Sequence, residues 1–276
     1  MLRPSRTGNA ILVFICLLII FPLFWMILTS IKPEKEIYTF PLTFFPKKIT
    51  LGNYFYILFE VEMFLRYVTN SIVVTVVATL GVIAFGMMGG YPLGRMQFLL
   101  RGIIFGFLVL IMAVPWNIYL IPVYILESRL GLRNSWAGLF LPYIALRLPW
   151  ALIILSGAFA SVPKDLEETA ILDGCRNFQV FSRILVPLVK PGMVAALLIT
   201  FIFVWKEFMF AVTLNSDSYW QTLPVGIVFL KDELQTLAYG RVSAAIILSL
   251  IPIFFIFFPM RNIFFTGIKE GGFLKE

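Results

Sequence analysis

Long uncharged stretches recur along this chain, and they constrain its fold more than any other feature. Six of them reach the length of about 20 residues that a helix needs to span a bilayer, at about 8–31, 67–91, 102–126, 135–160, 191–214 and 242–261. Only the fourth and fifth contain charged side chains in their interior, since Arg261 stands at the very end of the sixth. Because helices and closed barrels alone satisfy their backbone polar groups in lipid, the sequence predicts an all-α polytopic membrane protein with about six transmembrane helices. We treat residues 1–276 as a single transmembrane domain.

The overall composition supports lipid as the solvent of this chain. Hydrophobic residues make up 60% and charged residues 13%, against roughly 45–50% and roughly 25% in soluble domains. The net charge of +7 is spread thinly between apolar blocks, without the basic, aromatic-interleaved stripe of nucleic-acid binders. Anionic lipid headgroups are therefore the expected partner of this charge, and nucleic acid is not.

Missing residue types exclude several chemistries. The chain has no histidine, which rules out HExxH zinc sites, Ser-His-Asp triads and Cys-His dyads. No Lys is followed by Ser or Thr, so the phosphate loop GxxxxGK[ST] is absent. Two cysteines, Cys16 and Cys175, form no disulfide or metal framework. We predict no catalytic residue, no metal site and no cofactor bound by this chain.

The first apolar stretch could be mistaken for a signal peptide, because Arg3 and Arg6 precede it. It is longer than a typical signal core, and no small-x-small cleavage site follows at 29–33. We interpret it as a retained span. Orientation follows from the short link 91–100, which contains Arg95 and is followed by Arg101. Short basic loops stay in the cytoplasm, so an even number of spans places both termini there.

The loop at 161–190 is the most charged segment of the chain. Pro163 suits a first helical turn, and Asp165, Glu167 and Glu168 complement a helix N-terminus. Asp173-Gly174 is a turn signal, and Pro187 ends the segment after that turn. The sequence predicts two short helices joined at Gly174, each with one apolar face. By itself, this pattern fits a helix pair that lies on lipid or on the chain's own spans.

The loop also has a specific pattern. It reads Glu168-Thr169-Ala170, then Asp173-Gly174, then Ile184-Leu185-Val186-Pro187. This closely resembles the EAA loop of ABC importer permeases, in which EAA, three residues, Gly, nine residues and I-x-L-P follow one another. All spacings fit, and the two departures, Thr169 and Val186, conserve side-chain size.

The rest of the chain resembles the carbohydrate-uptake branch of that family, the maltose-type second permease. The similar segments are 41–46 and 50–54, 113–115 with 121–124 and 130–134, 221–226 and 266–272. The resemblance implies a multi-pass subunit of the prokaryotic plasma (inner) membrane. It implies as partners a second permease chain, an external substrate-binding protein, and two ATPase subunits that use ATP and receive the loop as a coupling helix.

Three charged side chains fall inside predicted spans. Arg147 lies about 12 residues, or roughly 18 Å at 1.5 Å per residue, from the outer end of the fourth span. Lys206 and Glu207 lie in the outer half of the fifth, between Trp205 and Phe208. The resembled family commonly has Asn where this chain has Lys206. Since ionisable groups at membrane depth usually face a cavity or a partner, these five residues are our candidates for the translocation path.

The roles of these side chains stay open at the level of sequence. We hypothesise that Arg147 and Glu207 pair across neighbouring helices beside the path. A purely structural pair, or Lys206 reaching outward to the interface, explains the charges equally well. The aromatic rings of Trp205 and Phe208 could stack on a sugar, although packing against lipid or helices is the commoner role.

The function that these features favour is the permease subunit of a sugar importer. An alternative with the same architecture is import of a glycerol phosphate or another anionic small solute, suggested by Arg147 and Lys206. A channel or secondary transporter would work without nucleotide. An intramembrane enzyme is disfavoured, because histidine is missing and no paired carboxylates sit at membrane depth.

Overall fold

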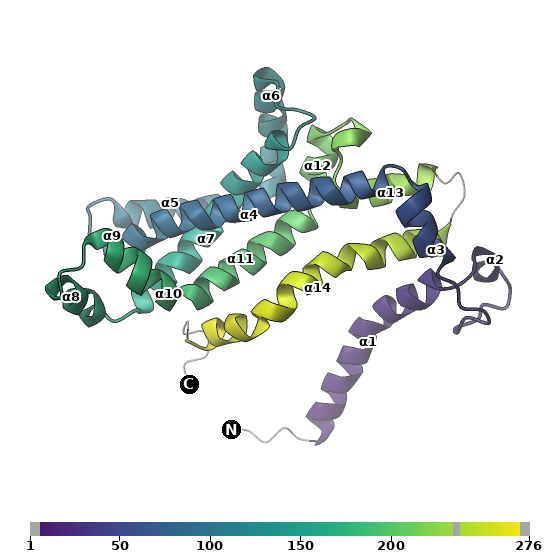
Figure 1. Ribbon diagram of the computed structural model, residues 1–276, viewed down its shortest axis with the longest axis horizontal. Coiled ribbons are helices and arrows are strands. Elements are labelled where there is room, and N and C mark those ends of the chain that lie inside the picture. Colours follow the sequence, from purple (N-terminus) through teal and green to yellow (C-terminus); the bar gives the residue numbers. More distant parts are fainter. Residues whose placement is uncertain (1–5, 234–237, 271–276) are drawn as a thin grey trace. The chain divides into compact units, whose positions relative to one another are not determined.

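A computed structural model describes residues 6–233 and 238–270 of the chain, and Figure 1 traces its helices. Among these residues there is no β-strand, so the predicted all-α class is confirmed. Four helices are long and apolar enough to cross a membrane: α1 (Arg6–Ser30), α4 (Phe64–Arg95), α7 (Ala137–Ser161) and α14 (Tyr239–Glu270). The predicted positions of the two chain ends fall on residues 1–5 and 271–276, outside the described part.

Two further spans are broken rather than straight. Helix α5 (Arg101–Ala113) is followed by η2 (Trp116–Tyr119) and α6 (Leu120–Leu130) at a bend of 89°. The break falls at Pro115, which has no N–H and cannot continue the helical hydrogen bonds. The segment 177–188 and α11 (Lys190–Trp205) meet at 70°. The described residues thus hold up to six candidate spans if each bent pair counts as one.

The fifth predicted span also differs from expectation. We predicted one span over 191–214, interrupted by the charged residues Lys206 and Glu207, but α11 ends at Trp205 and a separate helix, α12 (Met209–Leu214), follows. The Glu207 carboxylate accepts hydrogen bonds from the backbone N–H groups of Phe210 (2.9 Å) and Ala211 (3.1 Å). Free N–H groups at a helix start favour such an acceptor, and Glu207 therefore starts a new helix.

The chain divides into two compact units. The first comprises Met1–Arg66 and Val225–Pro252. After α1, it contains the short helices α2 (Glu34–Ile37), α3 (Gly52–Phe55) and η1 (Tyr56–Glu60). The Asn53 amide donates to the carbonyls of Ser30 and Lys32 (2.8 Å each), and the start of α14 contributes Arg241, whose guanidinium lies 3.5 Å from the Tyr56 ring centre. These contacts hold the loop after α1 against α14.

The second unit comprises Tyr67–Pro224 and Ile253–Glu276. Besides the helices above, it holds α8 (Asp165–Leu172), α9 (Asn177–Gln179), η3 (Val180–Leu185), α10 (Val186–Leu188), η4 (Ser218–Trp220) and most of the connection to α13 (Leu223–Glu233). Helix α7 contacts α5 and α11. In Figure 1, α8 and α9 lie at the end where α4 finishes and α11 begins.

Small residues bring α4 close to α7 in this unit. A Cβ atom at Gly90 would lie 2.9 Å from Leu155 Cβ, and one at Gly94 would lie 2.5 Å from the backbone oxygen of Ser156. Gly90 and Gly94 lie four residues apart on one face of α4, and membrane helices commonly use small residues at this spacing for close packing. Gly102 and Gly106 on α5 have the same spacing, but Cβ atoms added there would meet none of the described residues within 4 Å.

Candidate functional site

The loop 161–190 forms two helical segments that meet at Gly174, as predicted. Helix α8 ends in a left-handed turn, because Gly174 has φ +85°. The N–H of Gly174 donates to Ile171 O and that of Cys175 donates to Ala170 O, both at 3.0 Å. This pair of bonds is the Schellman motif, which stops a helix sharply and prefers glycine at this position. The second segment runs from α9 through η3 to α10.

The two faces of this loop differ in what they contact. On the inner face, Ala170, Val180 and Leu185 are buried in a cluster with side chains of α4, α7 and α11. On the outer face, Leu172 is 87% and Phe178 is 75% exposed. The inner face of the loop thus packs against the spans, and the outer face exposes apolar side chains.

The residues of the family pattern are distributed over both faces. Ala170 is buried, and Ile184 is half-buried. The exposed members are Glu168, Thr169, Asp173, Gly174 and Pro187. The Thr169 hydroxyl donates to Asp165 O at 2.7 Å, inside α8. The Glu168 carboxylate is exposed, so it is accessible to a partner chain.

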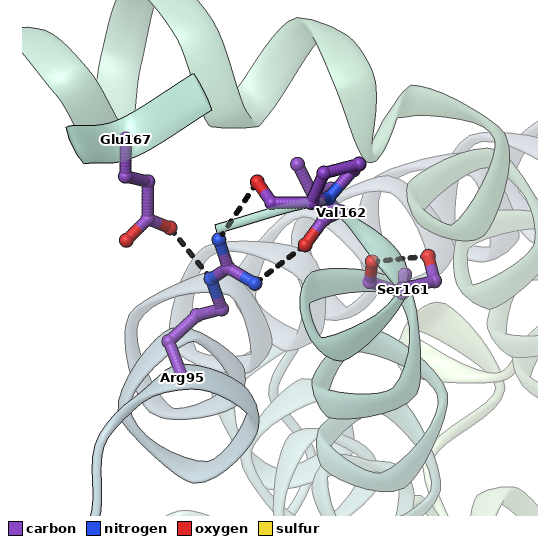
Figure 2. Close-up of polar contacts among 6 residues, drawn as sticks. Arg95, Ser161, Val162 and Glu167 are labelled. Carbon is purple, nitrogen blue, oxygen red and sulfur yellow. Dashed lines mark hydrogen bonds and ion pairs between the residues drawn. The ribbon is translucent and has the colours of Figure 1, made fainter. Parts of the chain in front are cut away.

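Arg95 anchors the start of the loop to α4. Its side chain is only 5% exposed, and Nε donates to Glu167 Oε1 at 2.6 Å. Nη1 donates to Val162 O at 2.6 Å and Nη2 to Pro163 O at 3.4 Å. Figure 2 shows the guanidinium between the Glu167 carboxylate and these linker carbonyls. A planar guanidinium suits such a site, because its donors point in fixed directions toward several acceptors at once.

Three aromatic rings make a second connection between the loop and the spans. Tyr91 of α4 lies 5.6 Å from Phe159 of α7 and 5.3 Å from Phe181 of η3, both in edge contact. Phe159 and Phe181 stack with ring centres 6.0 Å apart. The three rings therefore join the loop to both α4 and α7.

The charged side chains predicted at membrane depth, Arg147 and Glu207 among them, make different kinds of contact. Besides starting α12, the Glu207 carboxylate accepts a hydrogen bond from the buried Tyr143 hydroxyl of α7. No ion pair joins Glu207 to Arg147 among the described residues. The predicted pair is therefore not formed, because the donors of α12 and Tyr143 already surround the carboxylate.

Arg147 faces a different environment. Its guanidinium carbon lies 4.2 Å from the centre of the Phe203 ring and 5.5 Å from that of Trp150. It borders a cavity of about 200 Å³ between α5, α7 and α11. Within the described part of the chain, no hydrogen-bond partner contacts its buried Nε.

The other candidate path residues flank the break after α11. Trp205 is buried and stacks on Phe201 with ring centres 5.8 Å apart. Lys206 is exposed, and Phe208 is half-buried. Of the five candidates, Arg147 lines the cavity between α5, α7 and α11.

Sequence reasoning missed two side chains of this region. Arg95 entered only as a basic residue that sets orientation, although its position just before a turn and after a long apolar stretch could have marked it as a helix-end anchor. Tyr143 gave no signal, because aromatic residues are common inside apolar spans. Its partner lies 64 residues further along the chain.

The bent spans and the two-helix loop are features of a multi-pass membrane protein. The family model described as "Binding-protein-dependent transport system inner membrane component" matches residues 83–269. The chain belongs to this family.

Individual relatives extend the likeness over almost the whole length. A diacetylchitobiose uptake system permease protein of Streptomyces coelicolor is 34% identical, over 95% of this chain and 94% of its own. A sulfoquinovosyl glycerol transport system permease protein of Agrobacterium fabrum is 32% identical, over 92% and 88%. A crystal structure of a bacterial ABC transporter that imports the acidic polysaccharide alginate contains a chain with the same fold, at a TM-score of 0.80 and 22% identity, covering 96% of this chain and 100% of that one.

Proposed function

We propose that this chain is the permease subunit of an ATP-driven importer and forms part of the path for a sugar delivered by an external binding protein. The observation that carries the proposal is the two-faced loop at 161–190, which is fixed to α4 and α7 on its inner face and exposes Leu172 and Phe178 on its outer face. Both relatives described above are named for the transport of carbohydrates. Neither is named for a glycerol phosphate, so we favour a sugar or a glycoside, neutral or anionic, as the substrate.

The loop is the proposed docking element for the ATPase. Leu172 and Phe178 would enter an apolar cleft, and the exposed Glu168 carboxylate would pair with a basic side chain beside it. The turn at Gly174 leaves space for close approach of the partner's backbone. Two ATPase subunits would hydrolyse ATP, and this chain would bind no cofactor itself.

Closure of the ATPase pair would then move the spans through two named connections. The Arg95–Glu167 ion pair pulls on α4, and the stacked rings of Phe159 and Phe181 push on α7. We further propose a second, different permease chain as partner and a position in the prokaryotic inner membrane. The loop and both termini would face the cytoplasm.

Co-purification tests the docking surface directly. We would express the chain with its ATPase, its partner permease and the binding protein, and capture the complex through a tag on the ATPase. Leu172→Asp should release the chain from the ATPase, because a charge would be buried in the cleft. Leu130→Asp is the matched control, since Leu130 is 61% exposed on α6 and distant from the loop in sequence. Undiminished capture of Leu172→Asp would contradict the docking proposal.

Transport itself distinguishes the competing classes. In proteoliposomes that contain the whole complex and the loaded binding protein, we expect uptake of a sugar only when ATP is present on the ATPase side. Uptake without ATP, or without the ATPase subunits, would instead indicate a channel or a secondary transporter. A panel of mono-, di- and oligosaccharides with glycerol phosphates separates the sugar from the anionic alternative.

A further inference from the structure

We propose that the cavity beside Arg147 holds one ring of the transported sugar, with the guanidinium donating hydrogen bonds to the oxygens of that ring. This inference rests on the proposed function, since it specifies where a sugar would be bound along the path. All the residues that line the cavity belong to the second unit. Its walls combine a broken helix, aromatic rings and one buried cation.

The cation is the first reason to look for a ligand. Arg147 is 8% exposed and lies inside α7, a helix long and apolar enough to cross the membrane. Its guanidinium lies over the aromatic rings of Phe203 and Trp150, and its buried Nε has no acceptor among the described residues. Ionisable groups at membrane depth are costly and face a cavity or a partner. We therefore look for the missing acceptor in a bound ligand, because the described residues do not supply one.

The broken helix is the second reason. Val114 has an extended backbone (ψ 126°) between α5 and η2, and with Ala113 and Pro115 it lines the cavity. Non-helical backbone at membrane depth is tolerated where it is buried in protein or lines a cavity. In transporters, interrupted helices commonly form the substrate site, because their free backbone groups can bind the ligand. The break at Pro115 and the unpartnered cation thus face the same space.

The aromatic rings indicate which ligand fits. Trp116, Trp150 and Phe203 line the cavity, and Trp116 meets Phe203 in edge contact at 5.8 Å. A pyranose has flat faces of C–H groups, which pack on aromatic rings, and oxygens around its edge, which accept hydrogen bonds. Pockets of this kind bind ligands through apolar walls and few polar groups. A lipid chain would leave the guanidinium without an acceptor.

Photo-crosslinking tests whether the sugar enters this cavity. We would place p-benzoylphenylalanine at Leu146, which lines the cavity, in the otherwise unchanged complex. The matched control carries it at Phe107, which is 61% exposed on α5 and outside the cavity. During ATP turnover with tritiated sugar on the binding protein, illumination should label the chain at 146 and not at 107. Excess unlabelled sugar should abolish the label.

Substitution of Arg147 provides a second measurement. Loss of a charge-assisted hydrogen bond weakens binding about tenfold or more, so Arg147→Gln should lower both labelling at 146 and sugar uptake by this factor. Arg129→Gln removes an exposed positive charge on α6 and should leave both at the wild-type level. Arg147→Lys keeps the positive charge but lacks the planar set of donors of a guanidinium. Its labelling and uptake should lie between those of Arg147→Gln and the wild type.

Three results would overturn the inference. The first is sugar import by the complex without any label at position 146. The second is wild-type uptake by Arg147→Gln. The third is a combined result: the complex with Arg147→Gln loses the partner permease, and the unsubstituted complex shows no label at 146. This result would mean that a carboxylate of the partner permease is the acceptor for Arg147. If the unsubstituted complex imports no sugar, the proposed function itself is wrong.

Discussion

Arg95 Nε lies 2.6 Å from Glu167 Oε1, and this ion pair joins the last residue of α4 to the first turn of α8. The two residues are separated by 72 positions in the chain. The Glu167 carboxylate binds the almost completely buried side chain of Arg95, whereas the neighbouring Glu168 is exposed. The two carboxylates therefore serve different purposes. One holds the loop to the spans, and the other is free to contact a partner.

We expect Arg95→Gln to uncouple transport from ATP hydrolysis. The substitution removes one ion pair and two bonds to linker carbonyls, so α8 would move without α4. Charge-assisted hydrogen bonds contribute about 1.5–3 kcal/mol each, and we expect sugar uptake to fall on the order of tenfold. Uptake and ATP hydrolysis are measured in the same proteoliposomes. Equal losses of both would argue against a role in coupling.

Gly174→Ala should destabilise the loop through backbone strain alone. A side chain in the left-handed conformation costs about 1–2 kcal/mol, and no atom lies within 4 Å of the added Cβ. Gly157→Ala is the matched control, because that glycine is helical, also has open space, and gains about 1 kcal/mol of helix propensity. Thermal unfolding in detergent should shift in opposite directions for the two variants.

Gly94→Ala should separate α4 from α7. The added Cβ would lie 2.5 Å from a backbone oxygen, which cannot rotate away as a side chain can. Overpacking of this kind typically costs about 1–3 kcal/mol. Gly106→Ala on α5 meets nothing within 4 Å and should be tolerated. Comparable unfolding temperatures for both variants would show that the close contact is not required.

Substitutions of Glu207 and Tyr143 should have non-additive effects on stability. Tyr143→Phe removes one hydrogen bond and should cost about 1 kcal/mol, whereas Glu207→Ala also leaves two N–H groups of α12 without their acceptor. The double variant should be scarcely less stable than Glu207→Ala, because both substitutions break the same bond. Thermal unfolding of the four proteins measures the coupling. Simple additivity would mean that the bond contributes nothing.

The loop after α1 should lose order in acid. The Lys47 backbone N–H, which donates to Glu36 at 2.7 Å, lowers the pKa of Glu36 below its ordinary value of 4.5. A lowered pKa adds stability above pH 4.5 that is lost as the pH falls through the folded value. Hydrogen exchange of the Lys47 amide, corrected for its intrinsic rate, should therefore accelerate below pH 4.5.

Two comparisons check this acid response. Glu36→Ala should remove the protection of the Lys47 amide at every pH, since the acceptor is gone. The Thr50 amide, which donates to the backbone oxygen of Ile31 at 2.9 Å, has a partner that does not titrate and should stay protected. Parallel loss at both amides would instead indicate general unfolding.

Sequence patterns predicted the parts of this molecule that depend on local chemistry. The apolar stretches match helices because length and hydropathy alone decide whether a segment can cross lipid. The turn at Gly174 was predictable because a positive φ favours glycine. In both cases, neighbouring residues carry the whole signal.

Contacts between distant segments were not predictable in the same way. A span that is apolar all round gives no hydrophobic face from which its rotation could be inferred, so the pairing of Arg147 with Glu207 was a guess about proximity, and it was wrong. The break before α12 depends on Tyr143 and on the orientation of the Glu207 carboxylate. No pattern of neighbouring residues in the sequence indicates this contact or this orientation.

The interruption at Pro115 also affects the mechanics of the third span. A continuous helix distributes bending over its whole length, because each turn is bonded to the next. Here the series of helical hydrogen bonds is interrupted at Pro115. Rotation about the backbone of Val114 can therefore move α6 while α5 keeps its shape. Bending compliance is concentrated at a single residue beside the Arg147 cavity. The walls of that cavity can thus change their spacing without the melting of any helix.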